Sequence, residues 1–562
     1  MKLKIRALDR NGKGLPCRIT IQRLTFDEEQ YTEGLLRTVY CEGEYECSLE
    51  DGIYDINVYK GKLYKPYRQR ICMEGEDISI DAVLSPLVDV EAMGLYAFDG
   101  HSHVSRDRGL DSGNLSKAAL VMKGEGFHYF FAGSPYDNET HLECINNSFP
   151  NTDSYRERFA SLLNRLSDDK FVIDIGNENV KCRYGHIFLM NYTQDTPFNT
   201  YYDREFDPWL LTKVGDEPPY KLPYIYEAIA REREEHSVAV FAHPTSWWWH
   251  DNGEFVTNIA TTLGFEILAE SIDAMVVMGY RSDHTYYQEL WYDALNNGYF
   301  LPGVAETDTL LDAVPSKFIW FKTYTYSDGK FGDLDAYCDA IKKGRNIVST
   351  GPLVTLKVDG ELPGAVLKYT EDQKFHIDME AFACYEAALS RVQLIVNGEV
   401  HKEYNIHANH FKAEEYLSFG KDSFIIAKCY DYAGNVSFTN PVYIRNSPFV
   451  NRGYLSDVRV SVLKNNSPAE GVYSIDDGPE SPFKGEIHLK MKVSARLNIR
   501  VGDQAKTIRL FELKELQDIF KNLYFGWFNS DKKYLPGDIP AEYFQLRRIR
   551  EILDKVELSV DF

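Results

Sequence analysis

The sequence predicts a multidomain protein of the α/β plus β class, in which one α/β domain is flanked by β-sandwich domains. The chain has 562 residues, which is more than a single hydrophobic core usually organises. Short strand-like segments separated by turn residues fill residues 1–92 and 354–448. Between them, buried apolar runs alternate with amphipathic runs, which is the pattern of alternating strands and helices.

The flanking segments have the alternating apolar pattern and the turn residues of β-sandwiches. In residues 1–92, the alternating apolar side chains of Tyr54, Ile56 and Val58 mark a half-buried strand, and we expect an antiparallel sandwich. Residues 354–448 hold further strand-like runs, such as SRVQLIVNGEV, with Asn-Gly and Ala-Gly-Asn turns, and predict a second sandwich. Residues 449–562 mix strand-like and helical patterns, so we expect a mixed α/β appendix whose role the sequence does not indicate.

The middle segment, residues 93–353, is predicted to be the α/β domain. The apolar runs FVIDIG, VAVFAHP and AMVVMGY fit buried strands, whereas PYIYEAIAREREEH has the periodicity of an amphipathic helix. Functional groups in such folds lie on the loops that follow the carboxyl ends of strands. We therefore expect the functional residues just after these apolar runs.

Composition excludes several classes of partner. The formal net charge of -23 would repel a polyanion, so no nucleic-acid partner is expected. No apolar run approaches the ~20 residues that a membrane helix needs, so no membrane span is expected. The nine cysteines form no CxxC pair, which favours free thiols and a reducing, cytoplasmic location, or secretion if an export signal has been removed. A homo-oligomer stays open.

Two segments of the α/β domain carry paired candidate metal ligands. FDGHSHV contains His101 and His103, and this spacing on an extended strand points both imidazoles to one side. In IGNENVKCRYGH, Glu178 follows a buried run in what we expect to be an exposed turn, and His186 opens the next apolar run. A carboxylate and an imidazole are thus predicted at neighbouring strand ends.

Two later segments add one ligand type each. VAVFAHP ends in His243, and FLPGVAETDTLLD presents Asp308, with Glu306 and Asp312 nearby. Any one of these signals is weak, because a single His or Asp at a strand end is common. Four buried runs that all end in such residues are far rarer by chance, and together they predict a metal site.

The order of these motifs resembles the polymerase-and-histidinol-phosphatase (PHP) superfamily, and in particular its CehA/McbA-type metallohydrolase branch, over most of the chain. That branch carries D-x-H-x-H, G-x-E, Gly-His and His-Pro motifs and a final Asp. The matching residues here are Asp99, His101, His103, Glu178, Gly185, His186, His243, Pro244 and Asp308. The resemblance implies a transthyretin-like sandwich at residues 1–92 and a distorted (β/α) PHP-type barrel at residues 93–353.

The resemblance also implies a catalytic site with two divalent transition metals. The ligands implied for the first ion are His101, His103, Glu178 and Asp308. Glu178 would bridge to a second ion held by His186 and His243, and Asp99 would orient a ligating imidazole. Mixed imidazole and carboxylate ligands suit Zn, Mn or Fe.

The sequence departs from the family pattern at the third metal. Where many members have an Asp and a His after the first helix, this chain has Ser134 and Pro135, and Leu310 takes the place of a final His. Neither Pro nor Leu can bind a metal. A third ion is therefore not expected.

A two-metal site of this kind predicts a metal-dependent hydrolase. Two close cations lower the pKa of a shared water, so a metal-bridging hydroxide could attack a phosphoester, or a carbonyl ester or carbamate. Arg106 and Arg183 flank two of the motifs and could bind substrate oxygens. The general acid, for which His128 is one candidate, is left open.

The run Trp247, Trp248, Trp249 and His250 shortly after His243 offers an aromatic wall, which suits a small-molecule or glycan-like substrate. One alternative is a catalytically decayed carbohydrate- or ligand-binding protein that retains a metal site. A purely structural ion, which would be closed and four-coordinate, is another.

Overall fold

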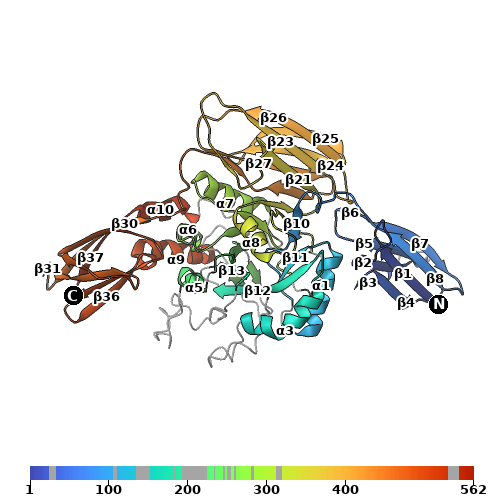
Figure 1. Ribbon diagram of the computed structural model, residues 1–562, viewed down its shortest axis with the longest axis horizontal. Helices are drawn as coiled ribbons and strands as arrows, with labels where there is room; N and C mark the ends of the chain where they lie inside the picture. The colour runs from blue at the N-terminus through green and yellow to red at the C-terminus, as the bar shows by residue number, and fades with distance from the viewer. Residues whose placement is uncertain are drawn as a thin grey trace.

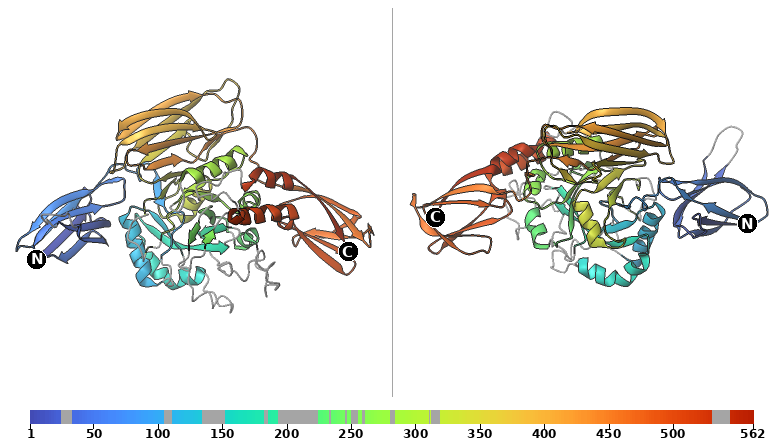
Figure 2. Two further views of the ribbon diagram at one scale, coloured as in Figure 1. Left: turned by 180° about the vertical axis from the view of Figure 1, so that it is seen from behind. Right: turned by 45° about the horizontal axis from the view of Figure 1, so that its top comes forward.

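The computed structural model describes residues 1–24, 33–104, 111–133, 152–181, 185–192, 224–232, 234–244, 247–249, 255–257, 261–279, 284–309, 311, 319–529 and 544–562. A central domain occupies the middle of the molecule, and a β-sandwich lies against it along one side (Figure 1). The two chain termini lie in separate β-rich domains at opposite ends (Figure 2). Among the described residues, strands make up 47% and helices 18%, so this part of the chain is mainly β.

The N-terminal domain is a sandwich of two sheets with strand orders β4-β1-β8 and β3-β2-β5-β7. Alternate residues of β1 and β2 point into its core, as the sequence pattern predicted. β8 pairs parallel with β1, so the sandwich is not purely antiparallel as we expected. Its strands, with the small β6-β9 pair, are β1 (Lys2–Leu8), β2 (Cys17–Leu24), β3 (Glu33–Cys41), β4 (Glu44–Ser48), β5 (Gly52–Tyr59), β6 (Tyr64–Lys65), β7 (Tyr67–Met73), β8 (Ile78–Val83) and β9 (Ser85–Pro86).

The central domain is built on one long sheet. Its strand order is β18-β17-β14-β13-β12-β11-β10-β19-β20, and beyond β20 the sheet continues into the next domain. These strands are β10 (Leu95–Phe98), β11 (Tyr129–Gly133), β12 (Val172–Lys181), β13 (Gly185–Met190), β14 (Val238–Ala242), β17 (Ala274–Met278), β18 (Gly303–Ala305), β19 (Lys322–Tyr326) and β20 (Asn346–Ser349), and a separate pair is β15 (Trp247–Trp249) and β16 (Phe255–Thr257).

This sheet contradicts the predicted (β/α) barrel. A barrel of that type needs parallel strands that close on themselves. β12, β13 and β14 instead pair antiparallel, as do β10, β19 and β20. Within the described part of the chain, the 15-stranded sheet runs from β18 to β25 and these two end strands do not pair. The prediction failed because alternating buried and amphipathic runs do not reveal the direction in which neighbouring strands pair.

Helices pack on the central sheet in two hydrophobic clusters. One cluster joins the sheet to α1 and α3, and the other joins it to α5, α6, α7 and α8. α1 starts at the capping box of Asp111 and Asn114, in which each side chain accepts the other's backbone N–H. The helices are α1 (Ser112–Gly124), α3 (Thr152–Leu166), α5 (Ile225–Glu232), α6 (Leu263–Leu268), α7 (His284–Asn296) and α8 (Leu334–Lys342).

The third domain is a sandwich that shares the central sheet. β20 pairs with β28 through Ile347 and Thr439, and β28 leads to β27, β24 and β25. A second sheet, β21-β23-β26, closes its core. The side chain of Asn440 bonds both backbone groups of Gly303 in β18, at 2.7 and 2.8 Å. The strands are β21 (Leu353–Val358), β22 (Val366–Leu367), β23 (Phe375–Phe382), β24 (Leu389–Val396), β25 (Glu399–Ala408), β26 (His410–Leu417), β27 (Ser423–Asp431), β28 (Val436–Thr439) and β29 (Val442–Ile444).

The C-terminal domain combines an 8-stranded sheet with two helices. Leu546 and Ile549 of α10 pack directly on Gly264 of α6, which ties this domain to the central one. Its elements are β30 (Ser456–Lys464), β31 (Ser467–Pro468), β32 (Glu470–Ile475), β33 (Ser481–Lys484), β34 (Glu486–Met491), β35 (Arg496–Val501), β36 (Gln504–Arg509), η2 (Leu510–Glu512), α9 (Lys514–Asn529), α10 (Leu546–Asp554) and β37 (Lys555–Asp561).

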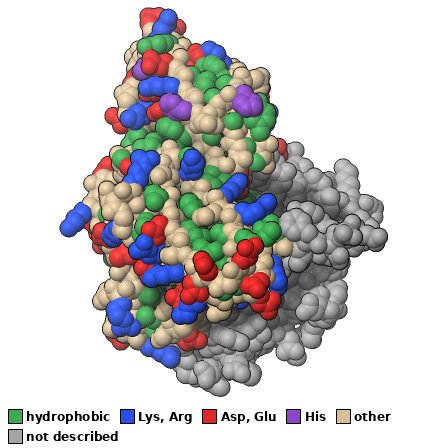
Figure 3. Space-filling model, turned by 90° about the vertical axis from the view of Figure 1, so that its right-hand side faces the viewer, with side chains coloured by type: hydrophobic (Ala, Val, Ile, Leu, Met, Phe, Trp, Pro, Cys, Tyr) green, Lys and Arg blue, Asp and Glu red, His purple; other side chains and the backbone are tan. Residues whose placement is uncertain are grey.

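Two surface properties bear on the predicted partners. None of the described helices is long and apolar enough to cross a membrane. On the side of the molecule shown in Figure 3, Lys and Arg side chains are interspersed with Asp and Glu rather than gathered into one basic patch.

Candidate metal centre

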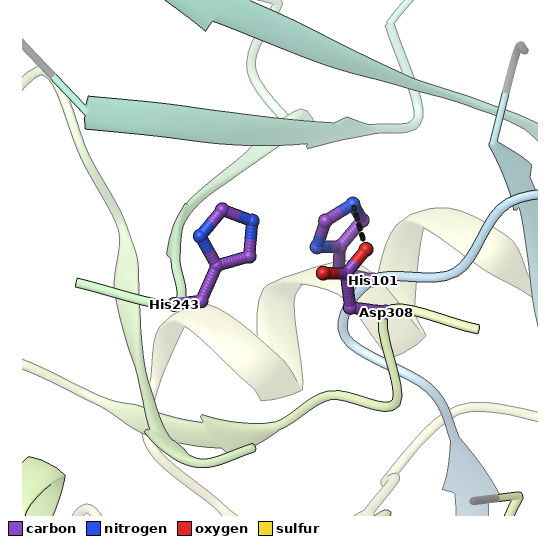
Figure 4. Close-up of side chains that lie close together, drawn as sticks. All are labelled: His101, His243 and Asp308. Carbon is purple, nitrogen blue, oxygen red and sulfur yellow. Dashed lines mark ion pairs between the residues drawn. The ribbon is translucent and has the colours of Figure 1, made fainter. Parts of the chain in front are cut away.

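Six side chains predicted from the sequence meet in one buried place in the central domain. They form three overlapping groups, and within each group the ligand atoms lie within 4.8 Å of one another. Figure 4 shows part of this meeting point, with the ion pair between His101 and Asp308 dashed. We call the six residues the ligand cluster: His101, His103, Glu178, His186, His243 and Asp308. Buried groups of His, Glu and Asp such as these could hold a metal ion.

His101 and His103 lie just beyond the end of β10. The Asp99 side chain accepts the backbone N–H of His101 at 3.1 Å, and the backbone N–H of His103 donates to Thr309. The two imidazole Nε2 atoms are 3.0 Å apart, so both rings point to the same side, as the spacing predicted. A Cβ added to Gly133 of β11 would lie 2.2 Å from the Ser102 carbonyl oxygen. Only glycine lets β11 approach this segment so closely.

Glu178 and His186 face each other across the β12-β13 hairpin. Val180 lies opposite His186 in the antiparallel register, so Glu178, two residues away, shares the face of His186. The Glu178 Oε1 atom is 2.8 Å from His186 Nδ1. We predicted Glu178 in an exposed turn after Gly176, and this was wrong, because β12 runs on to Lys181 and Glu178 is only 6% exposed.

His243 and Asp308 complete the cluster from two other strand ends. His243 follows β14, and its ring is 4.8 Å from that of His186, centroid to centroid. Asp308 follows β18, and its backbone N–H donates to the His101 carbonyl. Asp308 adopts a left-handed φ of 46°, a conformation that Asp tolerates better than most residues. Its side chain, at 11%, is more exposed than that of Glu178, at 3%.

The Glu178 carboxylate joins two sets of histidines. Oε2 lies 3.0 Å from His103 Nε2 and 3.4 Å from His101 Nε2. Oε1 lies 2.8 Å from His186 Nδ1 and 3.3 Å from His243 Nε2. Each oxygen therefore serves its own pair of imidazoles. This is the arrangement expected of a carboxylate shared between two cations.

Glu306 supports the ligand cluster, and sequence reasoning passed over its role. It is fully buried, with Oε2 3.0 Å from His101 Nδ1 and Oε1 3.0 Å from the backbone N of His243, which donates to it. The bond at Nδ1 leaves Nε2 of His101 facing the cluster, as an outer carboxylate does for a ligating histidine. The sequence signal was a second carboxylate two residues before Asp308, inside the same apolar segment.

Burial and neighbouring charges shift the pKa values of several residues of the ligand cluster. Burial would raise the pKa of Glu178, but the imidazoles of His101 and His186 outweigh it and hold that pKa well below its usual range. Burial would lower the pKa of His101, yet Glu178 and Glu306 raise it well above normal. For His186 the effect of burial is larger than that of Glu178, and its pKa falls to about 4. A bound divalent ion would replace the imidazole protons as the positive charge that neutralises Glu178.

The donor set fits a metal by two tests. His186 Nε2 is buried and has no hydrogen-bond partner among the described residues, although a buried imidazole nitrogen normally has one. The cluster also combines four imidazoles with two carboxylates, a mixture typical of Zn, Mn or Fe sites and unlike the all-oxygen cage of Ca²⁺.

The other predicted residues divide into two groups. Asp99 is buried and accepts the backbone N–H groups of both His101 and Thr307, so it braces the two segments that carry His101 and Asp308. His128 accepts the Ala97 N–H and lies near Glu91 rather than in the cluster. Trp247, Trp248 and Trp249 form β15. Outside the described residues lie Arg106, Ser134, Pro135, Arg183, His250, Leu310 and Asp312.

Comparison with known proteins does not place the chain in a family. No family model matches it, and no curated protein matches it. Similar solved structures include the major pilin subunit of Bacillus cereus, which is 7% identical over 100% of this chain and 98% of the pilin, with a TM-score of 0.20. Another is a β-glucuronidase of Bacteroides uniformis, 10% identical over 88% of this chain and 75% of the enzyme, with a TM-score of 0.15. Neither likeness is close enough to indicate a shared fold or function.

Proposed function

We propose that this chain is a metal-dependent hydrolase whose catalytic centre is the ligand cluster. The observation that carries the proposal is the position of Glu178, whose two oxygens each meet a separate pair of histidines. His101, His103, Glu178 and Asp308 would hold one divalent transition metal, and Glu178, His186 and His243 a second. Bound there, Zn, Mn or Fe would supply Lewis acidity and activate a water for attack on a phosphoester, carbonyl ester or carbamate.

The protein's own contribution is to hold the six side chains together in a buried place. Asp99 and Glu306 fix the backbone and ring positions of His101, and the β12-β13 hairpin fixes Glu178 against His186. The site is therefore built on strands and strand ends, which position ligands more accurately than long loops do. We further propose a small-molecule or glycan-like substrate, because three tryptophans form β15 shortly after His243.

The test uses Glu178→Gln, which keeps the shape of the side chain but removes its charge. Elemental mass spectrometry of protein purified without chelator should find about two transition-metal ions per wild-type chain. The variant should lose at least one ion, and hydrolysis of a generic phosphodiester or aryl ester should fall by more than ~100-fold, beyond what changes outside the ligand shell usually cause. The matched control is Glu289→Gln, at an exposed position of α7, which should leave both readings unchanged.

Two results would count against the proposal in different ways. If wild type takes up no ion even after Zn or Mn is added, the metal centre itself is refuted. If wild type holds ions but hydrolyses neither substrate class, the metal centre stands, and a ligand-binding protein that has lost catalysis becomes the better description.

A further inference from the structure

Two cysteines of the N-terminal sandwich lie face to face. Cys17 opens β2, Cys41 ends β3, and the two are direct partners in the antiparallel register. Their sulfur atoms are 3.5 Å apart, and the residues are 0% and 7% exposed. Among the described cysteines, this is the pair whose sulfurs are in contact.

The backbone already has the spacing that a disulfide needs. Direct partners in an antiparallel pair have Cα atoms about 4.5 or 5.5 Å apart, and disulfides span Cα distances of roughly 4.4–6.8 Å. Bond formation would bring the sulfurs about 1.5 Å closer, to an S–S length of about 2.05 Å. Rotation of the two side chains can supply this, because the backbone spacing already lies in the range that disulfides span.

We propose that Cys17 and Cys41 are an oxidation site, which a peroxide converts into a disulfide that crosslinks β2 and β3. The proposal does not depend on the metal centre. It differs from the free thiols that the absence of a CxxC pair suggested, because the fold brings together two cysteines that are far apart in the sequence.

The two sulfurs have different roles in the reaction. The two thiols share a hydrogen bond in which either sulfur can donate, and this contact lowers the pKa of Cys41 although burial opposes it. Cys41 is also the more exposed of the two, so its thiolate attacks the peroxide O–O bond, becomes a sulfenic acid and releases hydroxide. The Cys17 sulfur then displaces hydroxide from the Cys41 sulfur, and its proton completes a water. In sum, two thiols and one peroxide give one disulfide and two waters.

The crosslink would act on the contact between the sandwich and the central domain. Arg18 and Tyr40, the chain neighbours of the two cysteines, both bond the Glu125 carboxylate at 2.8 Å. Glu125 is the C-cap residue of α1, whose first turn follows the segment that carries His101 and His103. A disulfide would fix the spacing of the two strands that hold this helix end.

The experiment treats the full chain with hydrogen peroxide, blocks remaining thiols with an alkylating agent and maps peptides without reduction. We expect a peptide that links residues 17 and 41 and is lighter by two hydrogens than the reduced pair, and its loss on reduction. Cys17→Ser should trap Cys41 as a sulfenic acid, which a dimedone-type probe labels. Cys72→Ser, at an exposed position of β7, is the matched control and should still form the crosslink.

Two results would overturn the proposal. One is wild-type protein that keeps both thiols alkylatable after peroxide treatment while its circular dichroism is unchanged. The other is a disulfide that joins either cysteine to a third residue or to a second chain. Because both readings come from wild type, they hold even if a serine variant folds poorly.

Discussion

Replacement of Glu306 by Gln is predicted to weaken metal binding in the ligand cluster. The carboxylate accepts two hydrogen bonds, from His101 Nδ1 and from the backbone N–H of His243, each at 3.0 Å. Gln has a single acceptor oxygen, so it can serve one of these donors, and its amide nitrogen then faces the other. One of the two histidines loses its alignment.

The expected magnitude follows from the role of such partners. Changes to groups that orient a ligating histidine typically cost 10–100-fold in metal affinity, which corresponds to about 1.4–2.7 kcal/mol. Because one of the two histidines loses its alignment, we expect the affinity for at least one ion to fall in this range. Glu306→Asp, which keeps the charge but shortens the reach, should fall between wild type and Glu306→Gln.

The assay is competition between the metal-free protein and a chromogenic chelator during titration with Zn²⁺. Glu289→Gln again serves as the control for loss of one exposed carboxylate. If Glu306→Gln keeps its folded circular dichroism spectrum and binds both ions with wild-type affinity, Glu306 does not support the ligands and the reasoning fails.

Three further outcomes are expected. Adding Zn²⁺ or Mn²⁺ at a hundred times its dissociation constant should stabilise the metal-free protein by about 2.7 kcal/mol, and no rise in the thermal midpoint would contradict a metal centre. Gly133→Ala should cost roughly 1–3 kcal/mol of unfolding free energy, because its Cβ would lie 2.2 Å from the Ser102 carbonyl, whereas Gly420→Ala, in open space, should be neutral in the same urea titration. Burial lowers the pKa of His128 below its usual 6.5, so the unfolded chain takes up a proton there first, and stability is lost as pH falls from about 6.5. His128→Asn should reduce that loss between pH 7 and pH 5, and an unchanged slope would contradict it.

The sequence singled out the six residues that the fold brings together, because most of them stand at the ends of local apolar runs, and their role as metal ligands stays a prediction. His101, His243 and Asp308 stand at the ends of buried apolar runs, and the fold brings those ends together. Glu306 was missed because its partners lie 205 and 63 residues away along the chain, and no local pattern shows such contacts. The identity of the bound metal and the reaction stay predictions.

Strand direction was the weakest part of the sequence reasoning. The run from Val172 to Lys181 turns polar at NEN, which suggested a loop, yet Glu178 continues the strand because its face is lined by the ligand cluster rather than by solvent. Hydropathy patterns assign charged residues to the surface, so they do not reveal charged groups that are buried against each other. The antiparallel hairpin that follows then changes the topology from the predicted barrel to an open sheet.

The shared sheet between the central domain and the third domain limits how this protein can be divided. A truncation after residue 353 would strip β28 from β20, leaving a hydrophobic strand edge ready to pair with another chain. It would also remove Asn440, which holds Gly303 at the start of the segment leading to Glu306 and Asp308. The third domain therefore supports the ligand cluster, and the smallest unit that keeps the cluster intact includes this domain.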